Sequence, residues 1–411
     1  MHLGAVADDL TGATDLALIL SRAGFSVVQV ADVPASGALP EADAVVVALK
    51  SRTIPTTQAV EKSLAAAKAL LAGGAKQLFF KYCSTFDSTD QGNIGPVAEA
   101  LMELVGARAT IACPAFPRNG RTVYRGHLFV GDLLLSDSPM KDHPLTPMRD
   151  ANLVRVLQRQ CEREVSLIPL EAVRDADRLA GALRELDGLA IVDAVADEDL
   201  IALGHAVRDM KLITGGSALA MGLAKNFGLD AARRQEALDW PAGGGAVLAG
   251  SCSAATLRQI AAYRETGAPA FAVVLDEVVA GRQTPEQAAK FCREAGERAP
   301  LVFASAAPEA VAANQAQFGV SGAGERIEHF MAELATLLAE GGVTRFVVAG
   351  GETSGAVSTA LGVSTQRIGP EIDPGVPWTL AESRHGTLAL ALKSGNFGAE
   401  DFFAKALGML R

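Results

Sequence analysis

Two adjacent carboxylates near the N-terminus are the first residues whose types and spacing could do chemistry. Asp8 and Asp9 follow the apolar segment 2–7 and precede Thr11 and the segment 12–23, whose apolar residues have helical spacing. This pattern predicts a strand, a polar turn and a helix, and open α/β sheets bind ligands at such strand ends. Helix capping would explain one acidic residue but not two. The pair could grip vicinal hydroxyl groups or a metal ion.

A second polar segment, residues 81–95, follows a predicted strand and precedes a predicted helix. Its lysine could pair with a substrate carboxylate, and its aspartate could accept a hydroxyl proton. The alternative is a turn rich in Ser and Thr that ends in a helix cap. The candidate substrate or catalytic residues of this segment are Lys81, Asp87, Ser88, Thr89 and Asn93.

The long segment 114–148 is rich in Pro, Gly, Arg and Asp, and we expect it to be an irregular loop. Arg118, Arg121 and Arg125 lie within eight residues of one another, although the protein as a whole is acidic. Guanidinium groups match carboxylates in a bidentate way, so this spacing indicates an anion site, with a solvated basic loop as the alternative. We take Arg121 and His127 as candidate substrate residues, although a single histidine does not define a ligand.

Three segments rich in Gly and Ser in the second half predict a phosphate-binding site. Such turns before helix N-termini let backbone N–H groups approach phosphates. A Walker loop and a complete G-x-G-x-x-G are absent, which argues against a P-loop protein and against an NAD-dependent oxidoreductase. The candidate nucleotide residues are Ser251, Ser253, Gly350, Gly351, Glu352, Thr353, Gly395, Asn396 and Gly398.

The elements that must position these residues alternate between apolar strands and helices, which predicts an α/β fold with two doubly wound, mostly parallel domains. Expected strands are 2–7, 27–30, 44–49, 77–81, 110–112, 190–192 and 211–213, then 246–249, 270–274, 301–304 and 345–349. Pro241 and three glycines interrupt the pattern. We therefore predict domains 1–237 and 246–411, a linker 238–245, and an active site in the cleft between the domains.

Composition excludes several classes of protein. The 411 residues are 49% hydrophobic and 20% charged, which is typical of a globular protein with a large core. A formal net charge of −10 without basic runs argues against nucleic acid as a partner. No apolar stretch is long enough for a membrane span, and acidic residues stand where a signal peptide would be apolar, so we predict a cytoplasmic protein.

The five cysteines are scattered and have no metal-ligand spacing, so we expect buried, reduced thiols. They are Cys83, Cys113, Cys161, Cys252 and Cys292.

Several motifs together resemble the four-carbon acid sugar kinase family over essentially the whole chain. They begin at Asp8 (Asp-Asp-Leu-Thr-Gly-Ala), Asp87 (Asp-Ser-Thr), Gly350 (Gly-Gly-Glu-Thr-Ser-Gly) and Lys393 (Lys-Ser-Gly-Asn-Phe-Gly). Segments 81–89, 138–148 and 368–378 are similar to the 3-oxo-tetronate kinase branch.

This resemblance implies transfer of the ATP γ-phosphate, with Mg²⁺, to the 4-hydroxyl of a 3-oxo-tetronate. The acid sugar would be held by the N-terminal domain and ATP by the C-terminal one, with contacts from Ser253, 350–353 and Gly398. Asp9 and Asp87 are the candidates for the carboxylate that orients the attacking hydroxyl, and the sequence does not rank them.

The segment that begins at Lys81 departs from the pattern we expect of threonate kinases, with Thr85, Phe86, Asp90 and Gln91 at the variable places. Kinases for threonate or erythronate and a non-catalytic metabolite-binding protein are kept as alternatives. The residue that grips the substrate carboxylate, the metal ligands and the formation of a homodimer stay open at this point.

Overall fold

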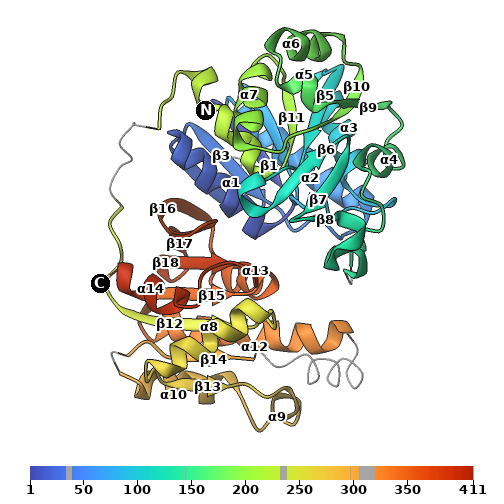
Figure 1. Ribbon diagram of the computed structural model, residues 1–411. Helices are drawn as coiled ribbons and strands as arrows, with labels where there is room; N and C mark the ends of the chain where they lie inside the picture. Colours follow the sequence, from blue (N-terminus) through green and yellow to red (C-terminus); the bar gives the residue numbers. More distant parts are fainter. Residues whose placement is uncertain (34–38, 144, 232–237, 297, 305–319, 411) are drawn as a thin grey trace. The chain divides into compact units, whose positions relative to one another are not determined.

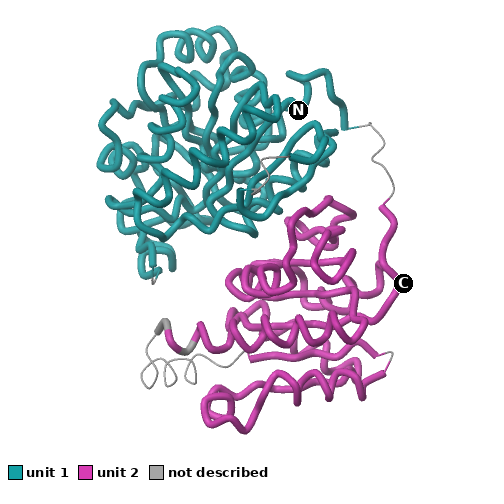
Figure 2. Tube along the Cα trace, turned by 180° about the vertical axis from the view of Figure 1, so that it is seen from behind, with its two compact units in different colours: residues 1–235 teal, residues 236–411 magenta. Residues whose placement is uncertain are grey.

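The chain folds into two compact units, Met1–Gln235 and Glu236–Arg411 (Figures 1 and 2). The computed structural model describes residues 1–33, 39–143, 145–231, 238–296, 298–304 and 320–410. Residue 237, the predicted end of the first domain, lies outside these ranges. The predicted linker 238–245 overlaps the first strand of unit 2, which begins at Gly244.

Unit 1 is built on an eight-stranded sheet in which every neighbouring pair is parallel. The strands lie side by side in the order β2-β3-β1-β4-β11-β5-β10-β9. In chain order they are β1 (Leu3–Ala7), β2 (Val27–Ala31), β3 (Ala44–Ala48), β4 (Gln77–Lys81), β5 (Ala109–Cys113), β9 (Val165–Ile168), β10 (Gly188–Val192) and β11 (Leu212–Gly215).

Helices cover both faces of this sheet (Figure 1). On one face α2 packs against α3, and on the other α1 and α7 pack against the short 3-10 helix η4. The helices are α1 (Leu10–Ala23), α2 (Thr56–Ala72), α3 (Ile94–Val105), α4 (Leu153–Gln158), α5 (Leu170–Val173), α6 (Ala176–Glu185), α7 (Asp197–Ala206) and η4 (Ser217–Gly222).

The central strands are apolar along their whole length because both of their faces are covered. All five residues of β1 and all five of β3 are buried, as expected for a parallel sheet between two helical layers. The strand order reverses around β1, which has β3 on one side and β4 on the other. Such a switch point is where open α/β sheets bind ligands.

The prediction of an irregular loop over 114–148 is wrong. The segment contains a small antiparallel sheet of β6 (Arg121–Tyr124), β7 (His127–Val130) and β8 (Leu133–Leu134). Arg125 and Gly126 join the first two strands with φ values of 52° and 71°, which matches a tight hairpin turn. These strands have at most four residues, too few for a visible alternation of apolar and polar residues.

Unit 2 has a seven-stranded sheet in the order β13-β14-β12-β15-β18-β17-β16. The pairs from β13 to β18 are parallel, and β18-β17 and β17-β16 are antiparallel. The strands are β12 (Gly244–Ala249), β13 (Ala270–Ala272), β14 (Leu301–Phe303), β15 (Val343–Ala349), β16 (Thr365–Asp373), β17 (Val376–Ser383) and β18 (Gly386–Lys393).

The core of unit 2 joins its sheet to helices on both faces. Helix α12 packs against α10 and α13, and α14 packs against α8. Trp378 is fully buried and donates from Nε1 to Ala406 O at 3.0 Å, which ties α14 to the sheet. The helices are α8 (Ala254–Glu265), α9 (Leu275–Val279), α10 (Pro285–Glu294), α12 (Val320–Glu340), α13 (Gly351–Ala360) and α14 (Phe402–Met409).

The predicted α/β fold is confirmed, with a fully parallel sheet in unit 1 and a mixed sheet in unit 2. Every strand predicted from the sequence agrees with an observed strand to within two residues at either end. The antiparallel strands β16 to β18 were missed, because polar residues such as Glu371, Glu382 and Thr387 interrupt their apolar pattern.

Candidate functional site

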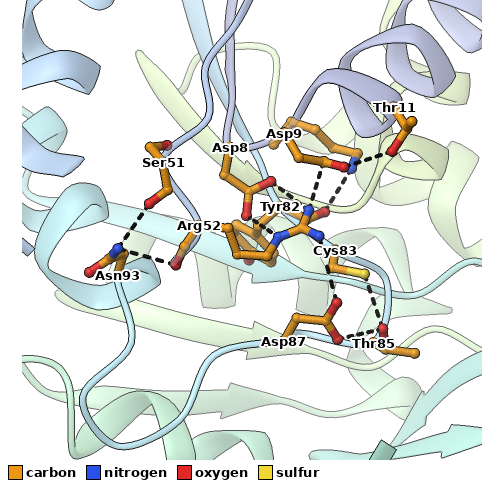
Figure 3. A network of polar contacts seen from close by, with 11 residues as sticks. Asp8, Asp9, Thr11, Ser51, Arg52, Tyr82, Cys83, Thr85, Asp87 and Asn93 are labelled. Carbon is orange, nitrogen blue, oxygen red and sulfur yellow. Dashed lines mark hydrogen bonds and ion pairs between the residues drawn. The ribbon is translucent and has the colours of Figure 1, made fainter. Parts of the chain in front are cut away.

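A cluster of charged side chains lies where β1, β3 and β4 end in unit 1 (Figure 3). Asp8 and Asp9 directly follow β1, and Arg52 lies between β3 and α2. The Arg52 guanidinium donates to both oxygens of Asp8, from Nε and Nη2, each at 2.8 Å. Nη2 also donates to Asp9 Oδ1 at 2.7 Å. The predicted carboxylate pair is therefore bridged by a cation that lies more than forty positions away in the sequence.

Arg52 is a functional candidate that the sequence analysis missed. A single arginine in a polar turn carries no motif, and the available signal was its place just after a predicted strand. Burial disfavours its charge, but Asp8 and Asp9 outweigh burial and raise the pKa of Arg52 well above its usual value. Its side chain keeps an exposed fraction of 22%, so Arg52 is not sealed off from solvent.

The two neighbouring carboxylates differ in their affinity for a proton. Burial raises the pKa of Asp8, even though Arg52 acts in the opposite direction. Burial alone would also raise the pKa of Asp9, but Arg52 and Lys81 together lower it to about 2. Asp9 is therefore a fixed negative charge and a weak base, whereas Asp8 holds a proton more readily.

Asp9 is held by neighbours on three sides. Thr11 Oγ1 donates to Asp9 Oδ2 at 2.8 Å, and Arg52 holds the other oxygen. The buried Lys81 donates from Nζ to Tyr82 O at 2.9 Å. Gly12 leaves room for this arrangement, because a Cβ there would collide with the Asp9 carboxylate and come within 2.7 Å of Lys81 Nζ.

A hydrogen bond joins α1 to η4, where Ser217 donates from Oγ to Asp15 Oδ2. Burial raises the pKa of Asp15, against the influence of Lys81 and Ser217. Ser217 begins η4 directly after Gly215 and Gly216, which pass close to the backbone carbonyls of 113 and 114. The sequence analysis did not single out either Asp15 or Ser217.

Asp87 reaches the same cluster from the segment that follows β4. Its Oδ2 lies 3.7 Å from Arg52 Nη1, and its Oδ1 accepts from Thr85 Oγ1 at 2.7 Å. Phe86 and Asp87 have φ values of 67° and 46°. Consecutive non-glycine residues in this left-handed region are uncommon and cost conformational energy, which is a pattern found at functional sites.

Asn93 holds the backbone of residues 51–54, the segment that carries Arg52. Its Nδ2 donates to the carbonyl oxygens of Ser51 and Ile54, both at 2.9 Å, and to Arg52 O at 3.2 Å. Its Oδ1 accepts from Thr56 Oγ1 at 2.9 Å. With both ends of the amide engaged, Asn93 fixes the backbone that carries the guanidinium.

Ser88 and Thr89 are anchored by Gln160. Ser88 Oγ donates to Gln160 Oε1 at 3.2 Å, and Gln160 Nε2 donates to Thr89 O at 2.6 Å. A small pocket beside the charged cluster is lined by Asp8, Arg52, Asp87, Ser88 and Asn93, together with Ser51, Phe80, Ile94 and Val97. The structure therefore places most of the predicted residues of segment 81–95 around one site.

Two of the three arginines in segment 114–148 pair with carboxylates. Arg118 pairs with Asp197, and Arg125 pairs with Glu171. Both arginine side chains are more than half exposed. The predicted three-arginine anion site stays a prediction, with two of its members paired to carboxylates of the same unit.

Arg121 and His127 lie on the first two strands of that hairpin. Arg121 donates to Asn119 O, and its Nε is buried without a partner among the described residues. His127 contacts Arg125 O through Nδ1 at 2.8 Å and Asn152 through Nε2 at 3.4 Å. None of these contacts joins Arg121 or His127 to the Arg52 cluster, so a substrate role for them stays a prediction.

In unit 2 the three predicted Gly/Ser segments meet at the carboxyl ends of β12, β15 and β18. Ser253 Oγ donates to Gly395 O at 2.6 Å and caps α8 by accepting from Thr256 N. A Cβ at Gly395 would lie 3.0 Å from Ser253 Oγ and would collide with Ser251 Oγ. Gly350 donates from N to Lys393 O at 2.9 Å. Segments separated by more than 140 positions thus form one small cradle.

Gly350 is the glycine of this cradle whose conformation matters. Its φ is 123°, and an added Cβ would lie 3.1 Å from Thr353 Oγ1 and 3.2 Å from Ser251 N. Gly351 begins α13 with open space around it. A residue other than glycine at position 350 would be strained and would fill the cradle.

The remaining candidates lie at the edge of the same cradle. Glu352 and Asn396 are exposed, and Gly398 has a φ of 85°. Gln259 donates from Nε2 to the carbonyl oxygens of Phe397 and Gly398 at 3.0 and 2.9 Å and so fixes the end of the loop. An open helix N-terminus, serine hydroxyls and a glycine without a Cβ fit a phosphate group.

The described ranges contain no candidate metal cluster, membrane-spanning helix or disulfide. No group of three or more His, Cys, Asp or Glu side chains there could hold a metal ion. No helix of the described residues has the length and apolar character needed to cross a membrane. All five cysteines are free thiols, and Cys113 and Cys292 are buried, whereas Cys83, Cys161 and Cys252 are partly exposed.

Comparison with known proteins adds a description to each unit. A family model for a sugar-binding N-terminal domain matches residues 3–223, and one for a nucleotide-binding C-terminal domain matches residues 246–403.

Similar proteins cover nearly the full chain. A 3-oxo-tetronate kinase of Burkholderia multivorans is 54% identical and one of Pseudomonas savastanoi is 51% identical, each over 99% of this chain and 97% of the relative. A crystal structure of a Salmonella typhimurium protein, provisionally described as a tRNA synthase, has a TM-score of 0.89 at 43% identity over 98% of both chains. A Haemophilus influenzae protein has a TM-score of 0.82 at 43% identity over 99% of this chain and 100% of its own.

Proposed function

The chain belongs to the four-carbon acid sugar kinase family, and from this premise we propose that it transfers the γ-phosphate of ATP to the 4-hydroxyl of a 3-oxo-tetronate. The observation that carries the proposal is its identity of 50 to 54% to several 3-oxo-tetronate kinases over at least 99% of its length. A new O4–P bond forms, the bond between the γ-phosphorus and the β–γ bridging oxygen breaks, and ADP leaves with the bridging oxygen.

We assign Asp87 as the carboxylate that orients the attacking hydroxyl. Its Oδ2 accepts no hydrogen bond from the described residues, since Arg52 Nη1 lies 3.7 Å away. It can therefore accept the 4-hydroxyl proton. Asp9 has both oxygens engaged and a pKa of about 2, so it acts as a fixed charge that holds Arg52. This ranking of the two carboxylates was open from the sequence.

Arg52 is our candidate for the group that grips the substrate carboxylate. Nε and Nη2 are committed to Asp8 and Asp9, whereas Nη1 has no hydrogen-bond partner among the described residues. Charge-assisted hydrogen bonds from guanidinium to carboxylate are short and strong. Lys81, the earlier candidate, is buried and donates to a backbone carbonyl, and its charge helps to lower the pKa of Asp9, so we assign it to the support of Asp9.

The cradle of unit 2 is proposed to hold the ATP phosphates. Backbone N–H groups near Gly350 and Gly395 and the hydroxyl of Ser251 would donate to them, whereas the Ser253 hydroxyl donates to Gly395 O and holds the loop. Bound magnesium supplies positive charge that stabilises the phosphoryl group during transfer. Since the described residues form no acidic metal cage, we propose that Mg²⁺ enters with the nucleotide and keeps several water ligands. The location of the active site in a cleft between the domains stays a prediction.

An ATP-consumption assay over a panel of 3-oxo-tetronates, threonates and erythronates tests this function. We expect turnover of a 3-oxo-tetronate, with a new 4-phosphate detected by mass spectrometry. Removal of divalent metal should lower the rate at least roughly a hundredfold, because an electrostatic contribution of several kcal/mol is lost. Preference for threonate or erythronate would change the specificity, and the absence of ATP consumption with every acid would favour a metabolite-binding protein.

A further inference from the structure

Lys393 is a lysine in the nucleotide cradle that the proposed reaction does not use. Its side chain is fully buried at the end of β18. Its Nζ donates to Ser394 O at 3.1 Å, Gly395 O at 3.0 Å and Thr256 Oγ1 at 3.1 Å. An ammonium group has three N–H donors, so the protonated form satisfies all three contacts. A neutral amine has two donors and one lone pair, so it keeps all three contacts only if the Thr256 hydroxyl turns to donate to it and no longer donates to Gly395 O.

These contacts set the direction of two successive peptide groups. In a planar trans peptide the C=O and N–H point in opposite directions. Because the Ser394 and Gly395 carbonyls face Lys393, the following N–H groups, those of Gly395 and Asn396, face away from it. Neither N–H has a hydrogen-bond acceptor among the described residues. Two adjacent outward N–H groups form a concave donor site of the kind that binds anions.

Gly395 O receives additional support from α8. Ser253 Oγ and Thr256 Oγ1 donate to it at 2.6 and 2.9 Å, so it accepts three hydrogen bonds in all. The loop is also fixed farther along, where Ala399 N donates to Asp373 Oδ2 at 2.8 Å. The outward direction of the Asn396 N–H is therefore set by one hydrogen-bond network, in which the ammonium donates to Thr256 Oγ1 and leaves the Thr256 hydrogen to Gly395 O.

Among the described residues, no carboxylate forms an ion pair with the buried ammonium. Charged groups on the surrounding elements include Arg258 on α8, Glu352 on α13, and the pair of Asp373 with Lys405 on β16 and α14. None of them alters the pKa of Lys393, which burial alone lowers to about 7. A phosphate on the outward N–H groups would supply the missing negative charge.

We propose that Lys393 is a positioning residue of the nucleotide site, and that only its protonated form turns the 394–396 peptides so that the Gly395 and Asn396 N–H groups bind a nucleotide phosphate. The inference rests on the proposed ATP site of unit 2 and adds a proton requirement to it. Because an anion stabilises the ammonium, nucleotide binding takes up a proton when Lys393 is neutral in part of the free protein.

The sign of the pH effect follows from this linkage. With burial lowering the pKa of Lys393 to about 7, we expect most Lys393 side chains to carry the proton near pH 6 and to have lost it near pH 8. If only the protonated form binds, the affinity for Mg·ADP falls about tenfold from pH 6 to pH 8, in proportion to the competent fraction. At pH 7 binding takes up about half a proton.

Calorimetric titration of the full-length protein with Mg·ADP tests this inference at pH 6, 7 and 8, in buffers of different ionisation enthalpy. Lys393→Met should weaken binding at pH 6 at least about tenfold and remove the protein's share of the proton uptake. Lys290→Met, an exposed lysine on α10, is the matched control and should behave as wild type. The ionisation of ADP itself is common to all variants and cancels in the comparison.

Thr256→Val keeps the ammonium but removes one of its acceptors. We expect roughly threefold weaker binding with the pH dependence retained, which separates loss of the charge from damage to the loop. Thermal unfolding checks that each variant folds, and the wild-type pH profile tests the proposal even if Lys393→Met does not fold.

Equal affinity and equal pH dependence of Lys393→Met and wild type would overturn this inference and leave the kinase proposal intact. Weaker binding with an unchanged pH profile would also overturn it, because Lys393 would then only stabilise the loop. Failure of the folded wild-type protein to bind Mg·ADP at any of the three pH values would overturn the ATP site and this inference together.

Discussion

The two candidate sites both lie at the carboxyl ends of strands, but different kinds of chemical group form them. In unit 1, charged side chains at the ends of β1, β3 and β4 pair with one another, with Arg52 between three carboxylates. In unit 2, backbone groups and hydroxyls at the ends of β12, β15 and β18 surround an open cradle above one buried lysine. Parallel strands position both sites, and the turn residues determine their chemistry.

This difference matches the ligands that we propose. A small acid presents a carboxylate and hydroxyls in a particular geometry, and placed charges can recognise them. A triphosphate presents many equivalent oxygens, for which backbone N–H groups suffice. Substitutions of charge should therefore affect unit 1 most, and substitutions that add a side chain should affect unit 2 most.

Asp87→Asn should give the largest effect on turnover. The amide keeps the shape but cannot accept the hydroxyl proton, so kcat should fall at least roughly a hundredfold, with Mg·ADP affinity within about threefold of wild type. Steady-state kinetics and calorimetry measure the two quantities. Asp90→Asn, an exposed neighbour that pairs with Arg159, is the control and should keep its activity. Loss of nucleotide affinity in Asp87→Asn would show that the two sites are not divided as proposed.

Arg52→Lys should raise KM for the acid sugar more than it lowers kcat. An ammonium cannot hold Asp8 with two parallel hydrogen bonds and also present a free edge to the substrate, so kcat/KM should fall about thirtyfold. Arg155→Lys, more than half exposed on α4, is the control. An unchanged KM together with a lower kcat would assign Arg52 to the transferred group and not to the substrate carboxylate.

Some residues of the two candidate sites could be found from the sequence, and others could not. Asp8, Asp9 and Asp87 could be found because each lies in a polar turn after a recognisable strand, and the Gly-rich turns of unit 2 have a composition suited to phosphate. Arg52 could not be found, because its role depends on the adjacency of β3 and β1, which the order of strands along the chain does not give. The direction of the Lys393 side chain likewise depends on tertiary packing.

Two interpretations of the sequence lacked the tertiary partners that the structure shows. The hairpin arginines Arg118 and Arg125 looked like an anion site because their carboxylate partners are distant in sequence. Asn93 stands at the N-cap position of α3 without a side-chain cap bond, because its amide instead holds the backbone of the segment that carries Arg52, and a substrate role for it stays a prediction. Residue type and spacing indicate which groups can act, and tertiary pairing decides which of them are already occupied.

Gly350→Ala should weaken Mg·ADP binding by about tenfold. The left-handed φ of 123° disfavours alanine, and its Cβ would press on Thr353 and on Ser251 N. Gly355→Ala, in the same helix with nothing within 4 Å of the new Cβ, is the matched control and should bind normally. KM for the acid sugar should change little in either variant. Equal binding by Gly350→Ala and the control would mean that the phosphates do not enter this cradle.

The smallest effects should come from the outer hairpin arginines. Arg118→Ala and Arg125→Ala each remove an exposed side chain that is paired with a carboxylate of unit 1, and exposed pairs contribute little. KM for the acid sugar should therefore stay within about twofold of wild type. Arg121→Ala sharpens the comparison, because the Arg121 Nε is buried without a partner among the described residues. A rise in KM for Arg121→Ala alone would add this residue to the substrate site, whereas a rise of more than tenfold in the two outer variants would restore the anion site that the sequence predicted.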